Sequence, residues 1–139
     1  MANQRELDEV YMNMAHELSK LSKAERKKVG CLIIKDTQII SEGYNGTPKG
    51  FDNDCEYYDY VQEIHTKPEV LHAESNAITK LARSTNSSSE STLYVTLAPC
   101  YDCAKLIIQA GIKRVVYKDK YARNGLDLLK KANIEIINL

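Results

Sequence analysis

Hydrophobic residues recur along this chain at two spacings, and these divide it into helices and strands. Between residues 5 and 21 the apolar side chains fall three and four positions apart, at Leu7, Val10, Tyr11, Met14, Ala15, Leu18 and Leu21. This spacing predicts an amphipathic helix with one apolar face. His16 lies off the apolar stripe, so we expect it on the surface and not at a metal.

Short apolar runs bounded by turn residues predict strands. The continuous run 29–34 predicts a strand buried on both faces, and 38–44 predicts its partner in a β-hairpin. The other predicted elements are strands over 92–97, 113–117 and 134–137 and helices over 73–83, 101–110 and 125–132. The order α-β-β-α-β-α-β-α-β predicts one domain over 1–139, with a five-stranded mixed sheet and helices on both faces.

Three segments have neither spacing. Residues 51–67 are polar and rich in acidic residues, which predicts a solvated loop or a short helix, and the serine-rich segment 84–91 predicts a connecting loop. The segment 44–50 holds two glycines, an asparagine and a proline, as irregular loops at strand ends do. It is either a plain turn or a substrate-binding loop in which the Asn45 amide both donates and accepts hydrogen bonds.

Composition and charge narrow the class of protein. Of 139 residues, 43% are hydrophobic and 27% charged, and the formal net charge is zero, as in ordinary globular domains. No apolar run is long enough for a membrane span, and the first residues lack a signal region. Four cysteines do not make a disulfide framework, so we expect a reducing, cytoplasmic location. A net charge of zero does not favour binding to long nucleic acids, but it is compatible with binding of a small nucleotide.

Two short motifs bring together residue types that bind zinc. The first is His72-Ala73-Glu74, and the second runs from Pro99 through Cys100 to Cys103 with C-x-x-C spacing. A catalytic zinc takes three protein ligands and keeps a position for water, and His72, Cys100 and Cys103 supply three. If Pro99 occupies the first helical position, both cysteines fall in the first turn, where the helix dipole favours thiolates.

Glu74 is not needed as a ligand, so we expect its carboxylate to take a proton from water beside the metal and to pass it on. The backbone N–H of Ala73, at a predicted helix start, is expected to donate to a carbonyl of the substrate. A C-x-x-C motif alone also fits a redox centre or half of a structural zinc site. No second C-x-x-C or C-x-x-H is present; Cys55 and His65 leave open a second metal site, and Cys31 fits the core.

The connector before the first strand is basic. Arg26, Lys27 and Lys28 follow one another there. They are either a solvated charge run or a place where one of them, best Arg26, meets a substrate phosphate. Arginine suits that role because its guanidinium offers a planar fork of donors.

The two metal motifs together resemble the H-x-E…P-C-x-x-C signature of the zinc-dependent nucleobase deaminases. The stretches 43–50, 72–78, 94–105 and 107–113 resemble the deoxycytidylate (dCMP) deaminase family, and the loop that begins at Gly43 is what narrows the resemblance to that family. The resemblance implies an α/β, three-layer α/β/α cytidine deaminase-like fold and Zn²⁺ on His72, Cys100 and Cys103. It implies hydrolytic deamination of dCMP to dUMP and ammonia, with Glu74 as the proton carrier and dUMP feeding thymidylate synthesis.

The same resemblance implies substrate contacts and partners. The expected contacts are Asn45, Lys49, Ala73 and Tyr121, with Arg26 at the phosphate. The known properties of family members imply a homo-oligomer, either a hexamer or a trimer. They also imply activation by dCTP and inhibition by dTTP, with Mg²⁺ bound to the effector. The short chain is similar to compact phage and bacterial members, so the cytoplasm is that of a bacterium or of an infected host cell.

Two other functions share these motifs. A tRNA adenosine deaminase carries both, but it would need a basic RNA-binding face, and the net charge here is zero. A catalytically silent nucleotide sensor could keep the fold and the zinc. Glu74 argues against the sensor, because a silent protein has no need of a proton carrier.

Overall fold

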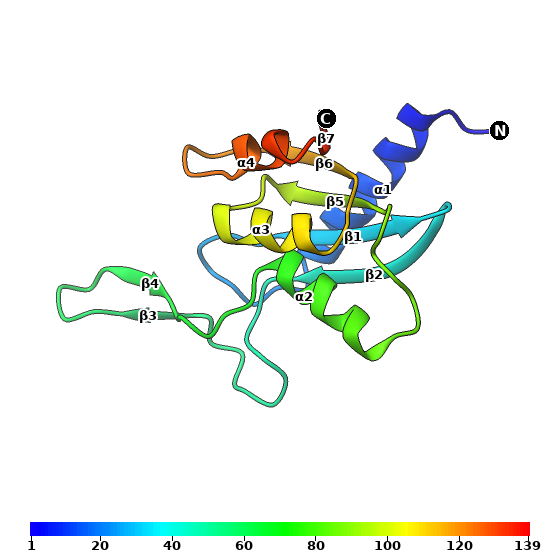
Figure 1. The fold of residues 1–139 in the computed structure, drawn as a ribbon. Helices are drawn as coiled ribbons and strands as arrows, with labels where there is room; N and C mark the ends of the chain where they lie inside the picture. Colours follow the sequence, from blue (N-terminus) through cyan, green and yellow to red (C-terminus); the bar gives the residue numbers. More distant parts are fainter.

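The centre of the molecule is a mixed five-stranded sheet. The computed structural model describes residues 1–139, and the strand order is β2-β1-β5-β6-β7 (Figure 1). These strands are β1 Gly30–Lys35, β2 Gln38–Tyr44, β5 Thr92–Leu97, β6 Arg114–Asp119 and β7 Glu135–Asn138. Strand β1 pairs antiparallel with β2 and with β5, while β5, β6 and β7 run parallel. The predicted five-stranded mixed sheet is confirmed.

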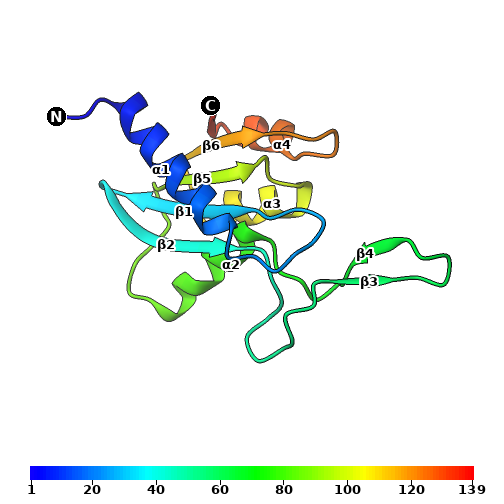
Figure 2. The same cartoon turned by 180° about the vertical axis from the view of Figure 1, so that it is seen from behind.

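Helices cover both faces of the sheet. Figure 1 is seen from one of these faces, and Figure 2 is seen from the other. The first face is covered by α2 Ala73–Lys80, which continues into the 3₁₀ turn Leu81–Arg83, by α3 Tyr101–Gln109 and by α4 Leu126–Lys131. The second face is covered by α1 Gln4–Ser19 alone. Side chains of β1 alternate between the two cores: Cys31 and Ile33 face α2–α4, and Leu32 and Ile34 face α1. Strand β1 is thus buried on both faces, as predicted.

The buried face of α1 differs from the predicted stripe. Its buried residues are Asp8, Met12, Ala15 and Ser19. Val10, Met14 and Leu21 are exposed, so the prediction was wrong for these three. The helix is rotated because the carboxylate of Asp8 has partners inside the protein, which hydrophobicity alone does not reveal. His16 is exposed, as predicted.

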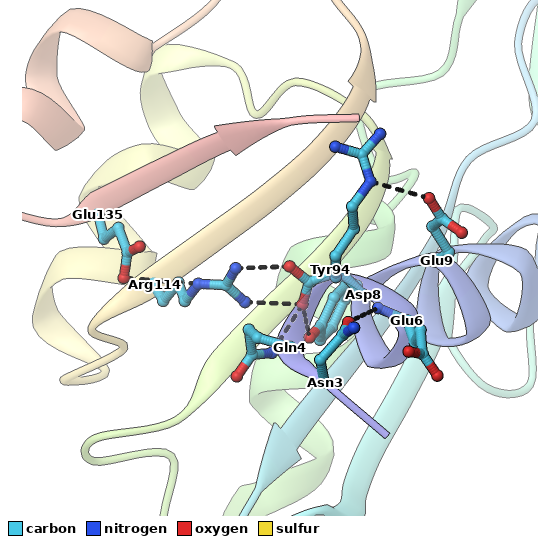
Figure 3. A network of polar contacts seen from close by, with 9 residues as sticks. Asn3, Gln4, Glu6, Asp8, Glu9, Tyr94, Arg114 and Glu135 are labelled. Carbon is cyan, nitrogen blue, oxygen red and sulfur yellow. Dashed lines mark hydrogen bonds and ion pairs between the residues drawn. The ribbon is translucent and has the colours of Figure 1, made fainter. Parts of the chain in front are cut away.

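Asp8 is the centre of a buried polar network that joins α1 to the sheet (Figure 3). The Arg114 guanidinium donates to both carboxylate oxygens, with Nη1 2.8 Å from Oδ1, and the Tyr94 hydroxyl and Gln4 Nε2 also donate to Oδ1. Burial acts to raise the pKa of Asp8, but these hydrogen bonds outweigh it and hold the pKa below its usual value. The network fixes α1 on β5 and β6.

Residues 51–67 fold differently from the prediction. They contain a two-stranded antiparallel hairpin, β3 Glu56–Tyr58 and β4 Ile64–Thr66, which projects from the body of the molecule (Figures 1 and 2). The expected solvated loop or short helix is therefore wrong. Asp59 closes the hairpin, because its carboxylate accepts from the backbone N–H groups of Val61 and Glu63. No helix of the molecule has the length and apolar character that crossing a bilayer requires.

Candidate active site

Two helix starts meet at the edge of the sheet where the parallel strands end. His72 is the N-cap of α2, with φ −74° and ψ 159°, and Cys100 is the N-cap of α3, with φ −71° and ψ 173°. Pro99 therefore precedes the cap and does not fill the first helical position, so the predicted place of Cys100 inside the first turn is wrong. Cys103 does lie in that turn, and its N–H donates to Cys100 Sγ over 3.4 Å. The cap geometry turns both sulfur atoms to the same side.

The three predicted ligand residues converge. His72 Nδ1 lies 3.4 Å from Cys100 Sγ and 3.3 Å from Cys103 Sγ. Tetrahedral zinc with ordinary Zn–N and Zn–S bonds places nitrogen and sulfur ligands about 3.5 Å apart. The donor set and its spacing therefore fit a zinc ion with three protein ligands. Contacts with Cys103 and His72 also lower the pKa of the Cys100 thiol to about 4, while contact with Cys100 and burial raise the pKa of Cys103.

Glu74 lies in the first turn of α2, only 4% exposed, and lines the same cavity as His72 and Cys100. Burial raises the pKa of its carboxyl to about 7. A carboxyl with such a pKa exchanges protons readily near neutral pH, which is the property that a general acid–base group needs. Cys31 lies in the core nearby, where burial and the Glu74 charge raise the pKa of its thiol.

A cavity of about 280 Å³ opens above these residues. Its lining includes five of the predicted site residues that do not bind zinc, namely Arg26, Asn45, Ala73, Glu74 and Tyr121. Burial and the neighbouring Cys100 and Glu74 charges raise the pKa of Tyr121 to about 12, so its hydroxyl stays protonated at neutral pH. The structure does not bring Lys49 to this cavity; Lys49 lines a second one instead.

Asn45 has a structural task that the sequence did not suggest. Its Oδ1 accepts from the Val29 N–H over 2.8 Å, and its Nδ2 donates to the Lys27 carbonyl over 2.7 Å. The side chain thereby holds the connector that carries the basic residues. Its role as a substrate contact stays a prediction. Glu56 and Thr66 also line the cavity, and sequence reasoning missed both because nothing in the local pattern links the hairpin to the site.

Cys55 and His65 do not come together as a second metal site. His65 Nε2 lies 2.7 Å from Asp59 Oδ2, and the His65 ring stacks on Tyr57 with centroids 5.3 Å apart. Cys55 is buried, and its Sγ lies 3.7 Å from the Asn53 carbonyl oxygen. The groups that could hold an ion are the His72, Cys100 and Cys103 site and an Asp59, Glu63 and His65 cluster to which Cys55 does not belong.

A histidine and two cysteines beside a buried glutamate, at helix starts along a mixed sheet, define the class of zinc-dependent nucleobase deaminases. The family model described as "Cytidine and deoxycytidylate deaminase zinc-binding region" matches residues 5–119. The chain belongs to this family.

Individual relatives agree with that assignment. The chain is 34% identical over 168 residues to the deoxycytidylate deaminase of Enterobacteria phage T4, covering 92% of this chain and 87% of that one. It is 40% identical over 121 residues to the human deoxycytidylate deaminase, covering 84% and 67%. It is also similar to the crystal structure of the dCMP deaminase from cyanophage S-TIM5 in complex with dCMP and dUMP. That match has a TM-score of 0.91 and 40% identity and covers 99% of this chain and 100% of that one. The resemblance to the dCMP deaminase family is confirmed.

Proposed function

We propose that this chain hydrolyses the exocyclic amino group of dCMP, giving dUMP for thymidylate synthesis and ammonia. The observation that carries the proposal is one cavity with His72, Cys100 and Glu74 in its wall and Arg26 in its lining. Relatives from phage T4 and human are named deoxycytidylate deaminase, and the S-TIM5 neighbour was crystallised with substrate and product. These similarities support a nucleotide substrate over an RNA.

His72, Cys100 and Cys103 would hold the zinc. When bound, the ion supplies the Lewis acidity that makes water nucleophilic near neutral pH. Glu74 takes a proton from the attacking water and gives it to ring nitrogen N3; it then takes the proton of the new C4 hydroxyl and gives it to the departing amino group. The C4–N bond breaks, ammonia leaves, and C4 keeps the oxygen. The N–H of Ala73, at the start of α2, would donate to the base carbonyl.

Arg26 would bind the 5′-phosphate. Its one side-chain hydrogen bond goes to Thr66 Oγ1 over 3.2 Å, and no carboxylate forms an ion pair with it. The guanidinium therefore keeps donors for a dianion. Tyr121 would pack beside the base, and Asn45 would contact the substrate through the cavity wall that it helps to form.

The test of the catalytic assignment is Glu74→Gln, which keeps the size of the side chain. Because the variant cannot carry the proton, we expect deamination of dCMP to fall by about 10³-fold. Zinc content, measured on the purified protein, should stay at one ion per chain. Glu69→Gln changes an exposed carboxylate in the approach to α2 and serves as the control. Near-normal turnover by Glu74→Gln would show that another group carries the proton.

We also propose how the enzyme is regulated and assembled. The nucleotide dCTP would activate it and dTTP would inhibit it, with Mg²⁺ bound to the effector. The chain would form a trimer or a hexamer. A second cavity, of about 650 Å³, supports an anionic effector because its charged lining residues are all cationic: Lys23, Lys49, Lys80 and Arg83. It shares Asn45 and Cys55 with the first cavity, which offers a physical connection between them. The cytoplasmic location stays a prediction.

A further inference from the structure

The base of the β3–β4 hairpin holds the connector that carries Arg26. The backbone N–H of Glu25 lies 3.1 Å from both carboxylate oxygens of Glu56, and the N–H of Arg26 lies 3.2 Å from Glu56 Oε2. Two consecutive N–H groups that converge on one carboxylate form an anion-binding nest. Glu56 therefore fixes the backbone from which the Arg26 side chain starts.

The opposite strand of the hairpin, β4, contacts the guanidinium of Arg26. Thr66 is the cross-strand partner of Glu56, and its Oγ1 accepts from Arg26 Nη1 over 3.2 Å. One cross-strand pair thus contacts both the backbone and the guanidinium of Arg26. All three residues line the cavity that holds Glu74.

We propose that Glu56, supported by Thr66, is a positioning residue for phosphate recognition. Glu56 holds Arg26 so that the guanidinium meets the 5′-phosphate of a nucleotide whose base lies at Glu74. The inference rests on the proposed function, because it requires Arg26 to contact the phosphate. It makes the hairpin a determinant of selectivity for nucleotides over nucleosides.

The charge of Glu56, considered alone, predicts the opposite effect on nucleotide binding. Glu56 brings a negative charge to a cavity that must accept a phosphate, so removing the charge would favour the nucleotide if Glu56 had no other part. Placement of the arginine predicts that removing Glu56 disfavours the nucleotide. The direction of the change in KM therefore separates the two explanations.

The experiment compares dCMP with deoxycytidine on zinc-loaded full-length protein. For Glu56→Ala we expect KM for dCMP to rise about tenfold with little change in kcat, because hydrogen bonds to a charged group are lost. The KM and kcat for deoxycytidine should change less than twofold. Glu56→Gln keeps one acceptor oxygen and should recover part of the loss, and Thr66→Val should show a smaller rise. Glu69→Gln changes an exposed carboxylate that follows the same hairpin and lines neither cavity, so it should match the wild type.

Two further variants identify which claim fails. Arg26→Ala should lower the preference for dCMP over deoxycytidine, and adding Glu56→Ala to it should change little, since both act on one contact. If Arg26→Ala leaves the preference unchanged, the proposed phosphate contact and this inference both fall. If Arg26→Ala lowers it while Glu56→Ala does not, only the inference falls. A lower KM for dCMP in Glu56→Ala, or an equal loss on both substrates, also overturns it.

Discussion

At the scale of single residues, two buried carboxyl groups have pKa values shifted in opposite directions. Asp8 is as deeply buried as Glu74, with exposed fractions of 3% and 4%. Asp8 has a full set of donors and its pKa is lowered, whereas burial dominates at Glu74 and raises its pKa to about 7. One carboxylate is thereby fixed in its charged form, and the other can change its protonation during a reaction.

The Asp8 network predicts a stability that depends on pH. Asp8→Asn should lower the free energy of unfolding at pH 7 by about 3 kcal/mol, because Arg114 keeps its buried charge without the matching carboxylate. The folded pKa lies below the ordinary 3.8, so the contribution of Asp8 is fully present above pH 3.8 and is lost as the pH falls toward the folded value. Urea unfolding of both proteins at several pH values measures the difference.

The difference in the free energy of unfolding between wild type and Asp8→Asn should shrink steadily below pH 4. The control is Glu9→Gln, because Glu9 lies on the same helix in an exposed pair with Arg5 that contributes little. A difference between wild type and Asp8→Asn that is constant from pH 7 to pH 3 would contradict the account, since it would mean that the Asp8 charge contributes nothing.

At the scale of elements, the site depends on how closely α2 approaches β2. A Cβ on Gly43 would lie 2.6 Å from the Ala73 carbonyl oxygen and 2.8 Å from the Ala77 backbone nitrogen. Glycine is therefore required in this strand so that the start of α2, with His72 and Glu74, can reach the start of α3. The 43–50 stretch matters to the site through this contact as well as through its loop.

Gly43→Ala tests the contact between α2 and β2. The added methyl group must push α2 away, so we expect a loss of about 1–3 kcal/mol in the free energy of unfolding and weaker zinc binding. Gly46→Ala is the matched control, because a Cβ there meets nothing within 4 Å. Zinc affinity is measured by competition with a chelator of known strength. Equal affinities in the two variants would show that the close approach of α2 does not position His72.

The same scale shows what the sequence could and could not predict. The order of helices and sheet strands followed from apolar spacing, and the convergence of His72, Cys100 and Cys103 followed from motifs that lie at helix starts. The Asp8–Arg114 pair joins residues 106 positions apart, and the Arg26–Glu56 contact spans 30. Such pairings depend on tertiary structure, so local periodicity missed the rotation of α1. The hairpin was missed because its strands have three residues each and none of their side chains is fully buried.

At the scale of the whole molecule, one face carries exposed hydrophobic side chains without a partner. Val10, Met14 and Leu21 on and after α1 and Ile39 on the edge strand β2 are 38–55% exposed. Contiguous apolar patches of this kind mark contact surfaces. This face gives the proposed oligomer a surface on which a second copy of the chain can pack.

The assembly proposal predicts a change of mass on mutation. Met14→Lys places a charge in the centre of this face and should lower the particle mass measured by light scattering. His16→Lys changes an exposed position off the apolar stripe and should leave the mass as in the wild type. If the wild type is a monomer at micromolar concentration, or if Met14→Lys keeps the full mass, this face is not the subunit contact.

The pairing of Glu56 with Thr66 at the hairpin base has a consequence for how the chain can vary in length. Residues can be inserted or removed between Tyr58 and Ile64 in numbers that keep the strands in register, because the base pair stays opposite. An insertion of one residue within either strand near the base reverses which side chains face Arg26. The hairpin tip is therefore the place for a tag or a grafted loop, whereas a single residue inserted at its base would replace the side chains that contact Arg26.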